Sequence, residues 1–398
     1  MLWDKGVQQS TFLGGIQMKN SLLTVGADLG NDSFKIIGPT KRELFIMNII
    51  SPWHERRVVN EDTRFPLNLL EVEVKSQNKN LGKYFVGGMA YNFNRGILKE
   101  RTVSDRHNGK ANDFETLIVL ITSIAVSLLK PNTKKVKEKI VLGTMLPTEE
   151  YFKNNKENVT LLENRLKGIH SVKFLNPVFN GIEVEFEIED LITQPEGLCA
   201  VNAIMYDDNG DLLDEYENNY SERTILGFDI GALTSDVTVI NNFELRTFFG
   251  IDKGTIDPLN RIIDHIKTEY KVSVSRHKLD NAIIRNEKLL VYGEEIPNLS
   301  DTCKQMIDFE ARQLVDEFTS KAAAAGIQLP DIGLIVLCGG GSLLFKEIIK
   351  KSLFRIPMIF SNNAVMLNAL GAWKNANRLK NEYHTPSSAL DYVAITAE

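Results

Sequence analysis

Short apolar runs recur along the chain, and their length predicts strands buried inside a sheet. Three of these runs occupy residues 22–25, 139–142 and 334–338. The sequence GIEVEFEIED at residues 181–190 instead alternates apolar and acidic side chains with a period of two. This alternation predicts a strand with one buried and one exposed face.

Other segments repeat apolar residues at the three- and four-residue spacing of an amphipathic helix. They are residues 257–270, 307–325 and 363–379. Pro195 suits the first turn of a further helix, because the first turn leaves its N–H groups without partners in the helix and proline has no N–H. Strands and helices alternate through both halves of the chain, which predicts an α/β fold.

The longest apolar stretch, residues 117–129, is interrupted by Thr122, Ser123 and Ser127. It is also shorter than the roughly 20 residues that a membrane-spanning helix needs. Asn112, with Glu115 three residues later, suits the cap of a buried helix. The last twelve residues, SSALDYVAITAE, are mixed and acidic, unlike an amphipathic membrane anchor. The sequence therefore predicts no direct membrane binding.

Composition narrows the class of protein. A chain of 398 residues is about right for two domains, and 43% hydrophobic with 25% charged residues is typical of a soluble globular protein. The net charge of −6 argues against direct DNA binding, which needs many lysines and arginines. The three cysteines, Cys199, Cys303 and Cys338, have no metal-ligand spacing and indicate a reducing, cytoplasmic compartment.

An acidic stretch at residues 207–222 reads as a connection between two domains. Its DDNGD core lacks the ligand spacing of a calcium loop and predicts a solvated turn. We expect an N-terminal extension at residues 1–17, which lack the pattern of a signal peptide. The first domain is expected at residues 18–206, with a C-terminal helix at 374–398 packing back on it, and the second domain at residues 207–373.

The most specific pattern in the sequence is an internal repeat. GADLG at residues 26–30 recurs as GFDIG at residues 227–231, so that Asp28 and Asp229 lie 201 residues apart (229 − 28). Each copy follows an apolar run, precedes hydroxyl side chains and leads to a second apolar run. Both copies therefore predict a strand, a tight turn and a second strand.

Glycine in such a turn permits a positive φ and lets backbone N–H groups approach an anion. A carboxylate beside a phosphate would repel it unless a cation lies between them. Asp28 and Asp229 are therefore predicted to organise Mg²⁺, held through its waters. Two such hairpins facing each other would grip a polyphosphate from both sides. The alternative is two ordinary hairpins whose Asp and Gly serve only the turn.

A third feature favours nucleotide binding. The apolar run at 334–338 leads into Gly339, Gly340, Gly341 and Ser342, and then into the helical sequence LLFKEIIKK. A strand, a glycine turn and a helix form a site for a phosphate or a nucleoside. The segment has neither the Walker A spacing nor the GxGxxG of dinucleotide-binding folds.

Taken in this order, the segments resemble the actin, Hsp70 and sugar-kinase superfamily over most of the chain. DLGNDSFK resembles its first phosphate loop, GFDIGALTSD its second and LCGGGSLLF its adenosine loop. NNAVMLNALGAW resembles its second connecting helix, with Asn368, Ala369 and Gly371 at a close crossing of the domains. The resemblance implies an actin-like fold: two related domains, each with a mixed sheet flanked by helices, and a nucleotide cleft between them. The nucleotide-binding residues that it implies are Asp28, Gly30, Asn31, Asp32, Ser33, Lys35, Gly231, Ala232, Leu233, Thr234, Gly339, Gly340, Gly341 and Ser342.

Within the superfamily, the sequence is most similar to the bacterial actin-like plasmid-segregation proteins of the ParM and Alp type. YFVGGMAYN, LGTMLPTEEYF, ITQPEGLCAV and FFGIDKGTIDPLNRI carry this likeness. In that family a carboxylate of the first connecting helix positions the attacking water, and Glu196 is similar in place, with Gln194 as its rival. Asp229 is expected near the same water, and Lys35 against the phosphates. The resemblance implies ATP or GTP with Mg²⁺ as cofactors, nucleotide-dependent filaments, and a DNA-binding adaptor on a plasmid centromere as partner.

Two other functions occur on the same fold. A small-molecule kinase would need a base for the acceptor hydroxyl and an additional substrate subdomain, and the sequence shows no signature of either. A chaperone ATPase would add a peptide-binding module, which we do not expect in a chain of this length. The sequence therefore favours a filament-forming nucleoside triphosphatase, with the kinase as the alternative.

Overall fold

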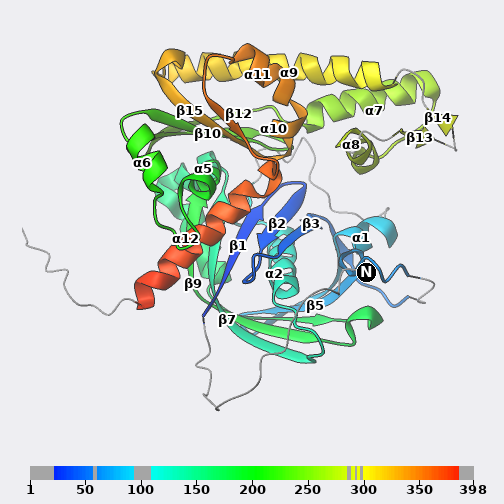
Figure 1. Ribbon diagram of the computed structural model, residues 1–398. Coiled ribbons are helices and arrows are strands. Elements are labelled where there is room, and N and C mark those ends of the chain that lie inside the picture. The colour runs from blue at the N-terminus through cyan, green and yellow to red at the C-terminus, as the bar shows by residue number, and fades with distance from the viewer. Residues whose placement is uncertain are drawn as a thin grey trace, which may run out of the picture.

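The computed structural model describes residues 22–56, 61–93, 109–284, 288–291, 294–295 and 299–384. Over these residues the chain forms two sheets flanked by helices, one above the other (Figure 1). The expected extension at 1–17 and residues 385–398 of the expected C-terminal helix lie outside the described residues. Among the described helices we find none with the length and apolar character to cross a bilayer.

The first sheet has nine strands in the order β3-β2-β1-β7-β9-β8-β5-β6-β4. Their bounds are β1 (Leu23–Leu29), β2 (Ser33–Ile37), β3 (Glu43–Met47), β4 (Ile50–Pro52), β5 (Leu70–Ser76), β6 (Lys79–Val86), β7 (Lys135–Leu146), β8 (Gly168–Phe174) and β9 (Glu183–Pro195). Its helices are α1 (Gly88–Phe93), α2 (Phe114–Ser127), α3 (Thr148–Phe152) and α4 (Glu157–Leu166). The sheet is mixed, because β1 is antiparallel to β2 and parallel to β7.

The second sheet has five strands in the order β12-β11-β10-β15-β16. They are β10 (Thr224–Ile230), β11 (Ser235–Asn241), β12 (Glu244–Ile251), β15 (Ile332–Cys338) and β16 (Met358–Phe360), with a small hairpin of β13 (Leu290–Val291) and β14 (Glu294–Glu295) apart from it. The remaining helices are α5 (Leu198–Met205), α6 (Asp214–Tyr220), α7 (Ile256–Tyr270), α8 (Arg276–Ile284), α9 (Leu299–Ala324), α10 (Gly340–Leu344), α11 (Lys346–Ser352) and α12 (Leu367–His384). Here β10 is antiparallel to β11 and parallel to β15, so the local topology around β1 is repeated.

Alternation along β1 explains how two helices cover it. Val25, Ala27 and Leu29 point into a core that contains most of α2, whereas Gly26 faces α12 on the other side. The same arrangement recurs on β10, where Phe228 packs in the core under α7 and α9 and Gly227 faces the loop before α5. The repeated GxDxG pattern therefore places its first glycine and its aspartate on one face of a strand, and its second glycine at the start of the turn that follows.

Backbone contacts at the glycines join the two sheets through α12 and α5. A Cβ on Gly143 of β7 would lie 1.8 Å from the Ala372 carbonyl of α12, and one on Gly371 would lie 1.7 Å from the Cys199 carbonyl of α5. No side chain larger than hydrogen fits at either place. The close crossing that the sequence predicts at Gly371 is therefore confirmed.

Several local predictions from the sequence are wrong. Pro195 ends β9 rather than opening a helix, and α5 begins only at Leu198, after Gly197 with a φ of +80°. The cap of α2 is Asp113, whose carboxylate accepts from the Thr116 N–H, and not Asn112. The predicted helix at 343–351 is broken at Phe345 into α10 and α11.

Other elements differ from the predictions mainly in length. α9 begins eight residues before the predicted start at 307, and the segment from 363 opens with a short 3-10 turn before α12. The predicted connection at 207–222 contains α6. Residues 181–190 do form part of an alternating strand, which continues to Pro195.

Candidate functional site

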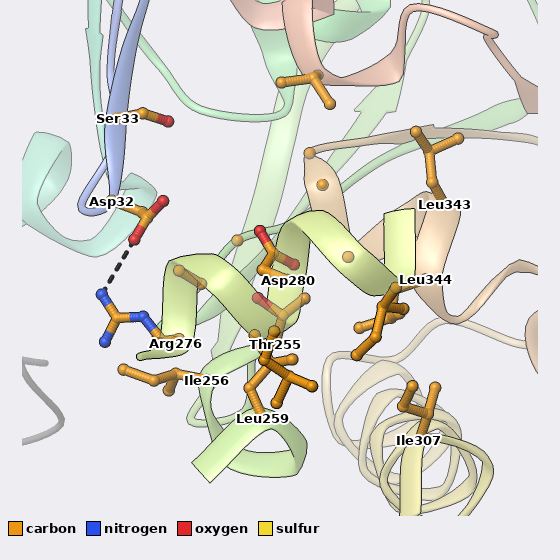
Figure 2. Close-up of a pocket in the computed structure, with 18 of the residues that line it drawn as sticks. Asp32, Ser33, Thr255, Ile256, Leu259, Arg276, Asp280, Ile307, Leu343 and Leu344 are labelled. Carbon is orange, nitrogen blue, oxygen red and sulfur yellow. Dashed lines mark hydrogen bonds and ion pairs between the residues drawn. The ribbon is translucent and has the colours of Figure 1, made fainter. Parts of the chain in front are cut away.

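A cavity of about 930 Å³ lies between the two sheets and is lined by elements of both. It receives the turn between β1 and β2 from one side and the turn between β10 and β11 from the other. The glycine turn after β15 and the helices α7, α8 and α9 complete its walls (Figure 2). The two repeated hairpins, far apart in sequence, thus meet at one cavity.

Most of the predicted site residues lie at this cavity. Those that line it are Asp28, Gly30, Asn31, Asp32, Ser33, Lys35, Glu196, Asp229, Gly231, Ala232, Thr234, Gly339, Gly340 and Gly341. Leu233 and Ser342 are buried and do not line it. The Ser342 hydroxyl instead donates to the Gly339 carbonyl at 2.7 Å, and so helps to hold the glycine turn.

The expected role of glycine in the two hairpin turns is wrong. Neither Gly30 nor Gly231, both in the described part of the chain, has a positive φ. Gly30 is needed for close approach, because a Cβ there would lie 2.3 Å from the Ser33 carbonyl and 2.5 Å from Lys35 Nζ. A positive φ, of +77°, does occur in the third turn, at Gly339, where a Cβ would also meet the Asp229 carboxylate.

Cross-strand partners of the two aspartates differ in charge between the hairpins. Asp28 pairs with Lys35 across β1 and β2, and Lys35 Nζ lies 3.4 Å from the Asp28 carboxylate. Burial alone would lower the pKa of Lys35, but Asp28, Asp229 and other carboxylates together raise it, so this lysine is a cation at neutral pH. On the second hairpin the partner of Asp229 is Asp236, so two carboxylates stand side by side.

The second hairpin therefore has two carboxyl groups side by side, where the first hairpin has a carboxylate and an ammonium group. Burial, together with the carboxylates of Glu196 and Asp28, raises the pKa of Asp229 to about 7. Burial, with Glu196 and Asp229, raises the pKa of Asp236 to about 8. Asn368 of α12 donates to Asp229 at 2.7 Å, and the Thr148 N–H donates to Asp236 at 3.1 Å.

Glu196 lies in the short segment between β9 and α5 rather than in a helical turn. Its backbone N–H donates to the Leu146 carbonyl at 2.9 Å, which fixes the segment against the end of β7. Its carboxylate accepts from Lys110 Nζ at 2.7 Å. Burial raises the pKa of Glu196, and the Lys110 ammonium opposes that rise.

Gln194, the rival for the same role, is engaged elsewhere. Its Oε1 accepts from Asn202 Nδ2 at 3.1 Å and also from Asn375, and Gln194 does not line the cavity. Of the two residues, Glu196 is therefore the one that lines the cavity.

Several ionisable residues of the cavity region were not predicted from the sequence, and three of them lie near the predicted site. Lys110 lines the cavity but lies in a polar segment without a motif, so no signal could have identified it. Arg276 reaches Asp32 across the cavity, with Nη2 and Oδ1 3.0 Å apart (Figure 2). Asp236 was detectable, because it follows Asp229 by the same seven residues that separate Lys35 from Asp28.

The part of the cavity away from the hairpins is mostly apolar. Leu259 of α7, Ile307 of α9 and the neighbours Leu343 and Leu344 after the glycine turn lie around it (Figure 2). Asp280 of α8 adds a carboxylate among them. A charged end beside three tight turns and an apolar end between helices suit the phosphates and the base of a nucleotide, respectively.

The donor set also suits a divalent cation that is bound together with phosphates. Asp28, Glu196, Asp229 and Asp236 are all buried carboxylates, faced by the two cations Lys35 and Lys110. Among the described residues no group of three or more metal-ligating side chains is arranged to hold an ion by itself. A hard cation that keeps its waters and takes phosphate oxygens as ligands needs no such group.

Comparisons with known proteins agree with this arrangement. Residues 26–198 match the family of actin-like proteins, N-terminal domain, and residues 227–351 match the family described as archaeal actin homologue MreB-like, C-terminal. A search of curated protein sequences gave no match. The two matched segments contain both hairpins and most of the strands of the two sheets.

Solved structures of actin-like proteins share the fold over nearly the whole chain. The actin-like protein Alp7A superposes with a TM-score of 0.72 at 15% identity, covering 91% of this chain and 98% of its own. A 15-stranded ParM filament from Clostridium botulinum gives 0.68 at 21% identity, with 90% and 99% covered. The archaeal actin homolog Ta0583 in complex with ADP gives 0.66 at 16% identity, with 90% and 100% covered. With its paired sheets and its repeated aspartate hairpins, the chain has the actin-like fold, and its two halves carry an N-terminal domain of the actin-like proteins and a C-terminal domain of the archaeal actin homologue type.

Proposed function

We propose that the protein is a nucleoside triphosphatase that binds ATP or GTP with Mg²⁺ and assembles into filaments with its nucleotide bound. The observation that carries this proposal is the meeting of Asp28, Glu196 and Asp229 at one cavity, from three separate parts of the chain. Phosphoryl transfer to water is accelerated mainly by alignment and by neutralisation of charge. The cavity offers residues for both tasks.

In this proposal each residue has a separate task. Lys35 and the backbone N–H groups of the turns bind the phosphates, and Glu196 orients or deprotonates the attacking water. Asp28 and Asp229 hold the waters of Mg²⁺, which supplies neutralisation of the phosphate charge when it is bound. The raised pKa of Asp229 suits a site that gains a cation together with its ligand, since the cation restores the ionised form.

The proposed cellular role follows from the relatives. One related structure is a ParM filament, and we propose that this chain likewise polymerises and segregates plasmid DNA through a DNA-binding adaptor on the plasmid centromere. A cytoplasmic location is supported by Cys199, Cys303 and Cys338, which are all free and buried. We also propose domain boundaries at 18–206 and 207–373, with α12 returning to the first sheet, where it packs along β1 and β7.

Substitution of the proposed water-positioning residue tests the mechanism. We expect Glu196→Ala and Asp229→Ala each to slow phosphate release by about 10²–10⁴-fold, while filaments still form and persist. Phosphate release and light scattering are measured together after addition of Mg-ATP or Mg-GTP. Glu244→Gln, at an exposed position of β12, is the matched control.

Two outcomes would contradict the proposal. Normal hydrolysis in both variants would remove Glu196 and Asp229 from the mechanism. The absence of a scattering rise in the wild-type protein, together with phosphorylation of a small metabolite, would instead identify a kinase on this fold.

A further inference from the structure

Hydrogen bonds to the backbone fix the position of Lys110, whose side chain lines the cavity. The N–H groups of Lys110 and Ala111 donate to the two carboxylate oxygens of Glu150 at 2.9 and 2.8 Å. Arg165 of α4 holds the same turn from the other side, donating to the carbonyls of Ala111 and Asp113. The turn before α2 is thus tied to both α3 and α4, and the starting point of the Lys110 side chain is set.

The side chain ends at a single carboxylate oxygen. Lys110 Nζ lies 2.7 Å from Glu196 Oε1, and the two side chains are 4% and 9% exposed. A charge-assisted hydrogen bond in such a buried place is strong and directional. Because it engages one oxygen of Glu196, it restrains rotation of the carboxylate about its last carbon–carbon bond.

No other cation among the described residues makes an ion pair with Glu196. Lys35, another lysine of the cavity, makes its ion pair with Asp28 instead. The carboxylate of Glu196 also faces Asp28, and its charge helps to raise the pKa values of Asp229 and Asp236 on the second hairpin. Lys110 therefore supplies a positive charge to Glu196 within a cluster of carboxyl groups, where the proposed mechanism needs an ionised, oriented carboxylate.

We propose that Lys110 is a positioning residue for nucleotide hydrolysis, acting through Glu196 by holding its carboxylate in the orientation that aligns the attacking water. The inference rests on the hydrolytic function proposed above. It assigns a task to a residue on the turn before α2, outside the three glycine-containing turns. Lys110 differs from Lys35 in this respect, because Lys35 is assigned to the phosphates themselves.

Substitution of Lys110 separates positioning from nucleotide binding. We expect Lys110→Met to lower the single-turnover hydrolysis rate by about 10²-fold, since a general base loses its alignment, and to leave nucleotide affinity within about threefold. Lys110→Arg keeps the charge and the donor and should recover most of the rate. Lys135→Met, at an exposed position in β7, is the matched control.

A double-mutant cycle tests whether Lys110 acts through Glu196. In a Glu196→Gln background, Lys110→Met should cause no further loss of rate, because the group that it positions is already disabled. This double variant also removes both buried charges together, which protects folding if the single Lys110→Met variant unfolds.

Three results would overturn the inference. The first is an unchanged hydrolysis rate in Lys110→Met, and the second is a further loss of rate when Lys110→Met is added to Glu196→Gln. The third is a large fall in the nucleotide affinity of Lys110→Met, which would mean that Lys110 binds the phosphates. If the wild-type protein shows no hydrolysis, the proposed function itself fails, so that failure is distinguishable from a failure of this inference.

Discussion

A single cross-strand position gives the two hairpins of the cavity different chemistry. Lys35 and Asp236 occupy equivalent places beside Asp28 and Asp229, so one hairpin presents a cation and the other a second carboxylate. The backbone repeat is thus combined with an asymmetry of charge. The first hairpin thus offers an ammonium group to a phosphate, whereas the second offers a pair of carboxyl groups to a cation.

At the same scale, His170 of β8 makes stability depend on pH. It is 1% exposed, its Nε2 lies 2.6 Å from the Leu166 carbonyl, and its Nδ1 has no hydrogen-bond partner among the described residues. Burial lowers the pKa of His170 below 6.5, so the folded protein binds this proton less readily than the unfolded chain. The contribution of His170 to the free energy of unfolding is therefore fully present above about pH 6.5. It decreases below that pH, by at most about 1.4 kcal/mol for each pH unit.

Urea denaturation at pH 7.5, 6.5 and 5.5 measures this effect. We expect His170→Phe, which keeps a ring beside Phe186, to lose part of the acid sensitivity of the wild type. An identical pH dependence in the two proteins would show that His170 does not contribute.

At the scale of elements, one ion pair joins the first hairpin turn to α8. Asp32 and Arg276 are 26% and 16% exposed, and their contact spans the cavity. A partly exposed pair contributes about 0.2–1 kcal/mol, which corresponds to a factor of about 1.4 to 5 in a rate. We expect Arg276→Gln and Asp32→Asn each to accelerate nucleotide dissociation by such a factor.

Displacement of a fluorescent nucleotide gives this rate directly. The double variant should dissociate no faster than either single variant, because the pair is broken only once. Additive acceleration would mean that each residue contacts the nucleotide independently.

The sequence predicted those elements whose cause is local. Periodicity identified β9 and α7, and the glycine repeat identified both hairpins, because these patterns reflect which face of a strand or helix is buried. It failed for Pro195, which pairs with β7 at the end of β9, and for the cap of α2, where α3 and α4 hold the turn before the helix. Lys110 could not be predicted from the sequence for a similar reason, because its role depends on contacts with Glu150 and Glu196, which are 40 and 86 residues away.

At the scale of the molecule, contacts between backbones join the two lobes. Gly143 lets α12 lie against the first sheet, Gly371 lets α12 touch α5, and Gly227 lets the Gly197 carbonyl approach the second sheet. At Gly371 an added methyl group would overlap a carbonyl oxygen that belongs to a helix and has little freedom to move. We expect Gly371→Ala to destabilise the protein by about 3 kcal/mol or more.

Thermal unfolding compares this variant with Gly340→Ala, where an added Cβ meets no atom within 4 Å. The control should unfold near the wild-type temperature. Equal stability of the two variants would mean that α12 and α5 can separate at little cost.

The tight crossing of α12 and α5 also limits how the lobes can move. Translation of one helix along the other would drive the Cys199 carbonyl into Gly371, whereas a small rotation about the point of contact leaves that separation unchanged. A small rotation about this contact would carry residues at the distant edges of the two sheets through longer arcs than residues beside the crossing.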